Sequence, residues 1–133
     1  MRVLFMKQPE TICNEFLSKF ENPVLVHDAA MEKKEGHKYD VPEGVETFAF
    51  PTRRNIDLSS KDALMSSKDY KVYVGMYIDK LVHFIRHNPT ATIIVPILGV
   101  YGKGVKNIFD KVLRPMLWEE LHMRSNVVLL WDE

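Results

Sequence analysis

The amino-acid sequence predicts a single α/β domain over residues 1–133, a three-layer α/β/α sandwich around a mainly parallel, mixed sheet. Two observations predict this fold class. Short β-branched runs alternate along the chain with longer stretches in which apolar residues recur every three or four positions. The 133 residues suit one domain, and 46% hydrophobic with 27% charged residues is an ordinary balance for a globular protein.

The first half of the chain predicts three strands and one helix. Each predicted strand is a short run rich in β-branched or other apolar residues, at residues 2–6, 23–27 and 46–50. Between the first two runs, Pro9 suits the first turn of a helix, and the Asn-Pro pair at the start of the second run ends it. The apolar stripe of this helix comprises Ile12, Cys13, Phe16, Leu17 and Phe20.

The second half predicts two helices and two strands. A Ser-Ser-Lys-Asp tetrad at residues 66–69 offers a serine cap and an acid for the first turn of a long helix. Its buried stripe comprises Tyr70, Tyr73, Val74, Tyr77, Ile78, Leu81, Phe84 and Ile85. The continuous β-branched run at 91–96 is typical of a strand buried on both faces. A helix over 105–117, kinked by Pro115, and a strand over 126–131 complete the chain.

Charge and cysteine content argue against several classes of protein. The 18 basic and 18 acidic residues cancel, which argues against general nucleic-acid binding but leaves room for a local basic pocket. Cys13 is the only cysteine, so there is no disulfide framework, and we expect a small buried hydrophobe in a reducing compartment. No stretch has the length of a membrane span or the pattern of a signal peptide. We therefore expect a soluble, cytoplasmic protein with no membrane association, no cofactor and no metal.

The sharpest functional signal is a glycine-rich segment between the predicted strand at 91–96 and the last helix. Residues 97–104 read Ile-Leu-Gly-Val-Tyr-Gly-Lys-Gly. The glycines let the backbone approach a ligand, and successive amides with the following helix N-terminus make an anion site, to which Lys103 adds a positive charge. A tight strand–helix turn accounts for the glycines equally well. Because Gly104 follows the lysine, the segment does not fit the Walker pattern.

Within this segment, Gly-Val-Tyr-Gly at residues 99–102 resembles the second phosphate loop of macrodomains, which bind ADP-ribose-type ligands. In that family the loop amides wrap the distal phosphate, and the aromatic residue lies near the distal ribose. The resemblance implies a macrodomain-like fold and a small-molecule nucleotide as partner. The ligand-binding candidates here are Gly99, Val100, Tyr101, Gly102 and, from the anion-site argument, Lys103 and Gly104.

Residues 26–31 (Val-His-Asp-Ala-Ala-Met) resemble a second element of the same family, which commonly reads Val-Asn-Ala-Ala-Asn. Asp28 stands in place of the first asparagine, and Ala29 matches the family. Met31 replaces the second asparagine, which in hydrolytic members helps to orient the ribose and the catalytic water. The resemblance therefore implies that Asp28 and Ala29 contact the ligand, while the methionine argues against the usual hydrolytic chemistry.

Residues 49–54 (Ala-Phe-Pro-Thr-Arg-Arg) are similar to the Phe-Pro-Thr-Lys element of some bacterial and phage macrodomain-like proteins. Arg53 and Arg54 follow a predicted buried strand, where their forked donors can clamp a phosphate. For at least one of the two arginines, a solvated loop position is the favoured interpretation. Thr52 can either cap the backbone or bind the ligand.

Other histidines and the tryptophans have more than one interpretation. His83 and His87 could share a metal, but no acidic residue stands between them as in His-Glu-x-x-His, so solvated histidines at a helix end are expected. His27, Asp28 and His37 could form an acid/base set near the ligand. We expect Trp118 to pack against the last strand, and an exposed tryptophan would indicate a homo-oligomer interface.

Three functional hypotheses follow. The first is a binder of ADP-ribose or a related signalling nucleotide, which by resemblance would be a phage-encoded sequestering protein. The second is an enzyme, an ADP-ribosyl hydrolase in which His27 or Asp28 activates water. The third is a protein-interaction module on a decayed macrodomain scaffold, with the charged segment at 28–45 as its contact surface.

Overall fold

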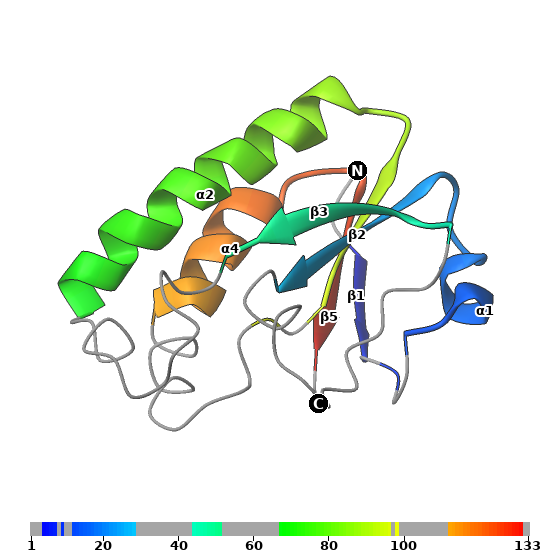
Figure 1. Cartoon of the computed structure of the whole chain (residues 1–133), viewed down its shortest axis with the longest axis horizontal. Coiled ribbons are helices and arrows are strands. Elements are labelled where there is room, and N and C mark those ends of the chain that lie inside the picture. Colours follow the sequence, from blue (N-terminus) through cyan, green and yellow to red (C-terminus); the bar gives the residue numbers. More distant parts are fainter. Residues whose placement is uncertain are drawn as a thin grey trace.

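A computed structural model of the chain describes residues 4–7, 9, 12–28, 44–51, 67–96, 98 and 112–131. Within these ranges, five strands and three α-helices alternate in the order that the sequence predicts (Figure 1). They are β1 (Leu4–Lys7), α1 (Asn14–Leu17), β2 (Pro23–Asp28), β3 (Glu46–Phe50), α2 (Ser67–His87), β4 (Thr92–Val95), α4 (Arg114–Leu121) and β5 (Val127–Trp131). The predicted α/β fold class is confirmed.

All five strands are parallel, in the spatial order β1-β5-β4-β2-β3. In the centre, Leu25 of β2 has Thr47 of β3 on one side and Ile94 of β4 on the other. Beyond β4 come β5 and then β1. The prediction of a mainly parallel sheet is confirmed, while the strands that the structure describes include none that runs antiparallel, as a mixed sheet would require.

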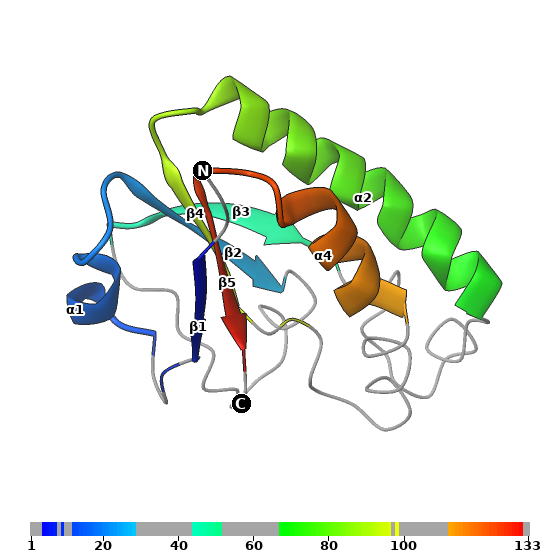
Figure 2. The same ribbon diagram turned by 180° about the vertical axis from the view of Figure 1, so that it is seen from behind.

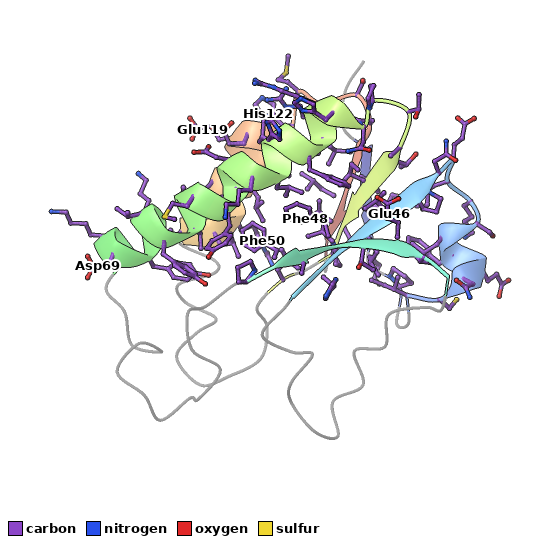
Figure 3. The ribbon with its side chains drawn as sticks, turned by 45° about the horizontal axis from the view of Figure 1, so that its top comes forward. Glu46, Phe48, Phe50, Asp69, Glu119 and His122 are labelled. Carbon is purple, nitrogen blue, oxygen red and sulfur yellow. The ribbon has the colours of Figure 1, made fainter. Side chains whose placement is uncertain are left out.

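One face of the sheet, called here the α2 face, is covered by α2 and α4, which lie side by side (Figures 1 and 2). The stripe predicted for α2 is buried or half-buried along its whole length. From β3, Phe48 and Phe50 point toward this helix (Figure 3). Their ring centroids lie 5.2 Å from that of Phe84 and 6.4 Å from that of Tyr77, respectively. Aromatic contacts therefore fix α2 over the edge strand.

The predicted limits of α2 are also confirmed. The helix begins inside the Ser-Ser-Lys-Asp tetrad at 66–69, with Asp69 in its first turn, where the helix dipole favours a negative charge (Figure 3). It ends at His87. Asn88 Nδ2 then donates a hydrogen bond to the carbonyl oxygen of Phe84 at 2.8 Å, and the following proline cannot continue the helix.

Of the helix predicted over 105–117, the structure describes the part from Val112 onward. A wider, π-helical turn at Val112 and Leu113 precedes α4, which begins at Arg114. Pro115 therefore lies in the first turn of α4, where its missing N–H leaves no helical hydrogen bond unmade. The predicted helical residues 105–111 lie outside the described residues.

The expected packing of Trp118 against the last strand is wrong. Leu117 and Leu121 are the residues of α4 that are buried against the sheet. Trp118 follows Leu117 by one position, which turns it about 100° round the helix axis. Its side chain is 42% exposed, and its ring stacks on that of His122, with the centroids 4.9 Å apart.

The opposite face, called here the α1 face, carries a smaller core. Phe16 and Leu17 of α1 pack in one cluster with Leu25, Ile94 and Val128 of the strands. Cys13 is half-buried and packs against the same cluster, which fits the expected role of a small apolar side chain. Since α1 is the described helix on this face and has four residues, the described chain shows one full helical layer and a single turn opposite it.

The sequence overestimates the length of α1. A helix from Pro9 to Phe20 is expected, yet Cys13 still has extended backbone, with φ −120° and ψ 173°. Beyond Leu17, the backbone N–H of Phe20 bonds the Leu17 carbonyl only three residues back, at 3.1 Å. The tightening turn ends the helix, and Asn22 then takes a left-handed φ of 47° just before β2.

Side-chain hydrogen bonds join the segments at the amino ends of the strands. Asn126, which precedes β5, donates from Nδ2 to the carbonyl oxygens of Asn88 at 3.2 Å and Ala91 at 3.1 Å. Thr92 Oγ1, at the start of β4, donates to the carbonyl oxygen of Glu21 at 2.6 Å. The first pair of bonds holds the end of α2 on the sheet, and the second holds the segment that follows α1.

Candidate functional site

The carboxyl ends of all five strands meet at one edge of the sheet, since every strand pair is parallel. Three neighbouring strands in the middle and at one side, in the order β4-β2-β3, end at Val95, Asp28 and Phe50. Each of the three segments singled out in the sequence, 26–31, 49–54 and 97–104, begins in or shortly after one of these strands. The fold therefore brings together the starting points of segments that lie far apart in the sequence.

The chain leaves β2 and β4 in opposite directions across the sheet. From β2 it moves outward to the edge strand β3, and from β4 it moves the other way to β5. Because β2 and β4 are neighbours, their carboxyl ends form a topological switch point. In open parallel α/β sheets, ligands bind in the crevice outside the strands at such a point. The switch point is the candidate site.

His27 is the candidate catalytic residue whose side chain the structure describes. It is 3% exposed and lies next to the end of β2, where Ala49 of β3 is its partner in register. Successive residues of a strand alternate between faces, so His27 shares the α1 face with Leu25. Such burial leaves the imidazole little surface for contact with bulk water, which favours a structural or positioning role.

The remaining candidates lie at or beyond the limits of the described residues. Asp28 is the last residue of β2. The ligand-binding candidates outside the described residues are Ala29, Thr52, Arg53, Arg54, Gly99, Val100, Tyr101, Gly102, Lys103 and Gly104. Met31, the substitution that argues against hydrolysis, also lies outside them. The structure thus describes the strands that precede these residues, and the residues themselves lie outside the described part of the chain.

A row of aromatic side chains on α2 leads to the carboxyl end of β3. The rings of Tyr70, Tyr73 and Tyr77 follow one another with centroids 6.2 and 5.2 Å apart, and Phe50 at the carboxyl end of β3 continues the row. Lys80 Nζ lies 5.0 Å from the centroid of Tyr77. Helical spacing predicted that the tyrosines form one stripe, but only the tertiary structure shows that Phe50 joins it.

The described part of the chain holds neither a metal cluster of three or more ligands nor a helix that could span a membrane. Within it, no group of three or more His, Cys, Asp or Glu side chains is placed to hold a metal ion. None of the helices found there has the length and apolarity to cross a membrane. His83 and His87 are both exposed, as the sequence predicts.

Comparison with known proteins assigns no family to the chain. No protein-family model, curated protein or solved structure matches it. The functional argument therefore rests on the residues themselves and on the strands that carry them.

Proposed function

We propose that the protein binds ADP-ribose or a related nucleotide at the switch point between β2 and β4. The observation that carries this proposal is the adjacency of β4, β2 and β3, because each of the three segments that resemble macrodomain elements begins in or shortly after one of these strands. A parallel sheet collects the carboxyl ends of its strands, so one ligand can reach residues that follow all three.

In the proposed complex, the amides of the glycine-rich segment at 97–104 capture the distal phosphate. Lys103 and one of Arg53 and Arg54 supply positive charge, and an arginine can bind a phosphate through two parallel N–H donors. The role is capture of a nucleotide rather than its turnover. Two features support capture: Met31 replaces the asparagine that hydrolytic macrodomains use, and His27 is 3% exposed.

Calorimetric titration with ADP-ribose, and separately with a cyclic nucleotide, tests the proposal. We expect saturable binding of at least one of them and its loss in Gly102→Glu, since a carboxylate in the phosphate loop repels the anion. Lys103→Glu should weaken binding, whereas Lys19→Glu makes the same charge change at an exposed position near the amino end of β2 and should not. A folded protein that binds neither ligand would reject the proposal.

The position of the ligand has its own test. Backbone amide NMR shifts on titration should concentrate at Asp28 and Val95, at the carboxyl ends of β2 and β4, and should spare Thr92 and Val127 at the amino ends. Incubation with an ADP-ribosylated protein should yield no free ADP-ribose. Release of ADP-ribose by the parent chain but not by His27→Ala would instead favour the hydrolase hypothesis.

A further inference from the structure

His83 and His87 lie one turn apart on the exposed side of α2. They take no part in the proposed nucleotide site. We propose that their imidazoles form a chelating pair for a divalent first-row transition metal ion, Cu²⁺ or Zn²⁺. Residues four apart on a helix are neighbours on its surface. Here both side chains are exposed, and their ring centroids lie only 4.0 Å apart at an interplanar angle of 32°.

A hydrogen bond prepares His87 to act as a ligand. Its Nδ1 lies 2.8 Å from the carbonyl oxygen of His83. Because a carbonyl oxygen only accepts hydrogen bonds, Nδ1 carries the proton, and in the neutral imidazole this leaves the lone pair on Nε2. Histidines that bind metals commonly donate their other ring N–H to a backbone carbonyl in this way, which fixes both the tautomer and the ring orientation.

The surroundings of the pair suit a cation and define its class. His87 is the last residue of α2, and the negative end of a helix dipole favours positive charge. Neutral imidazole suits copper and zinc, whereas Mg²⁺ and Ca²⁺ prefer oxygen ligands. The described residues offer no third His, Cys, Asp or Glu ligand, so within this part of the chain the remaining positions would be filled by water. The pair is thus a two-ligand site with open positions.

His122 provides a matched control within the same chain. It follows α4, and its Nδ1 makes the equivalent bond to the carbonyl oxygen of the residue four positions back, Trp118, at 2.9 Å. Its ring, however, stacks on the indole of Trp118 with the planes 16° apart, not on a second imidazole. His122 therefore has the same orienting bond but no second imidazole stacked on its ring.

The test is calorimetric titration of the full chain, first freed of metal with EDTA, with Cu²⁺, Zn²⁺ and Mg²⁺. We expect one Cu²⁺ or Zn²⁺ ion to bind each chain and no binding of Mg²⁺. His83→Gln and His87→Gln should each lower the affinity at least about tenfold, the lower bound for loss of even an outer partner of a metal site. His122→Gln should leave it unchanged.

A second measurement guards against variants that merely disturb the helix. Glutamine is a good helix former, so the circular dichroism of each variant should match that of the parent chain. Added Zn²⁺ should raise the melting temperature of the parent chain and of His122→Gln, because an ion bound to the folded state stabilises it. It should not raise the melting temperature of the double variant His83→Gln/His87→Gln. Equal metal affinity in all variants, or a loss confined to His122→Gln, would overturn the assignment.

Discussion

The two faces of the sheet differ in how their cores are covered, and β4 allows a direct comparison. Ile93 and Ile94 are consecutive residues of this strand, and both are 0% exposed. Ile93 belongs to the cluster on the α2 face, under a helix of 21 residues, and Ile94 to the cluster on the α1 face, beside a helix of four. Equal burial therefore need not mean equal rigidity of the surroundings.

Because of this difference, the two faces should contribute unequally to the stability of the fold. A long helix held by many contacts cannot readily move into a cavity, whereas a single turn can follow the lost volume. The α2 face should therefore dominate the stability of the fold. The α1 face, which also holds His27, should tolerate change more easily.

The largest expected effect comes from truncating the two isoleucines. Ile93→Ala should lower the free energy of unfolding by about 4 kcal/mol and Ile94→Ala by about 2 kcal/mol, because only the second cavity can be partly filled by relaxation. Urea unfolding followed by circular dichroism measures both losses. Equal losses would show that α1 is as firmly held as α2.

A smaller effect is expected from the polar links at the amino ends of the strands. Asn126→Ala removes two hydrogen bonds that hold the end of α2 and should cost about 2 kcal/mol. Thr92→Val removes one bond, to Glu21 after α1, and should cost about 1 kcal/mol. The same unfolding measurement applies, and a larger loss for Thr92→Val would reverse the proposed ranking of the two faces.

The smallest expected effect is a gain in stability on the α2 face. A Cβ at Gly75, inside α2, would meet Met116 Cε at 3.7 Å, an ordinary van der Waals contact. Gly75→Ala should therefore stabilise the protein by about 0.5–1 kcal/mol through helix propensity. Gly44→Ala is the control, because Gly44 has a φ of +84° and an alanine there is strained. The melting temperature, measured by thermal unfolding, should rise for Gly75→Ala and fall for Gly44→Ala.

Local patterns predicted those elements whose limits are set by local chemistry. The strand at Glu46–Phe50 was predicted with its observed bounds, because β-branched and aromatic residues precede a proline. The buried stripe of α2 followed from helical periodicity over many turns. The short stripe before Asn22 predicted too long a helix, because a single turn flanked by extended residues can bury Phe16 and Leu17 as well as a longer helix can.

Local sequence patterns did not predict the tertiary features of the fold. Trp118 was expected to be packed, yet its exposure depends on which flank of α4 a neighbouring element covers. The spatial order of the strands also has no local signal. For the candidate site, the sequence predicted residues around Asp28 and the 97–104 segment, but the adjacency of β2 and β4 that relates them required the sheet topology.

The pairing of β1 with β5 has a consequence for synthesis. Leu4 lies opposite Val128, so the strand that leaves the ribosome first among those described must wait for the last before it can join the sheet. Until then β4 has an open edge on that side, and β1 lacks the strand with which it pairs in the described sheet. Such long-range pairing slows folding and prolongs the exposure of unpaired, aggregation-prone strand edges in the nascent chain.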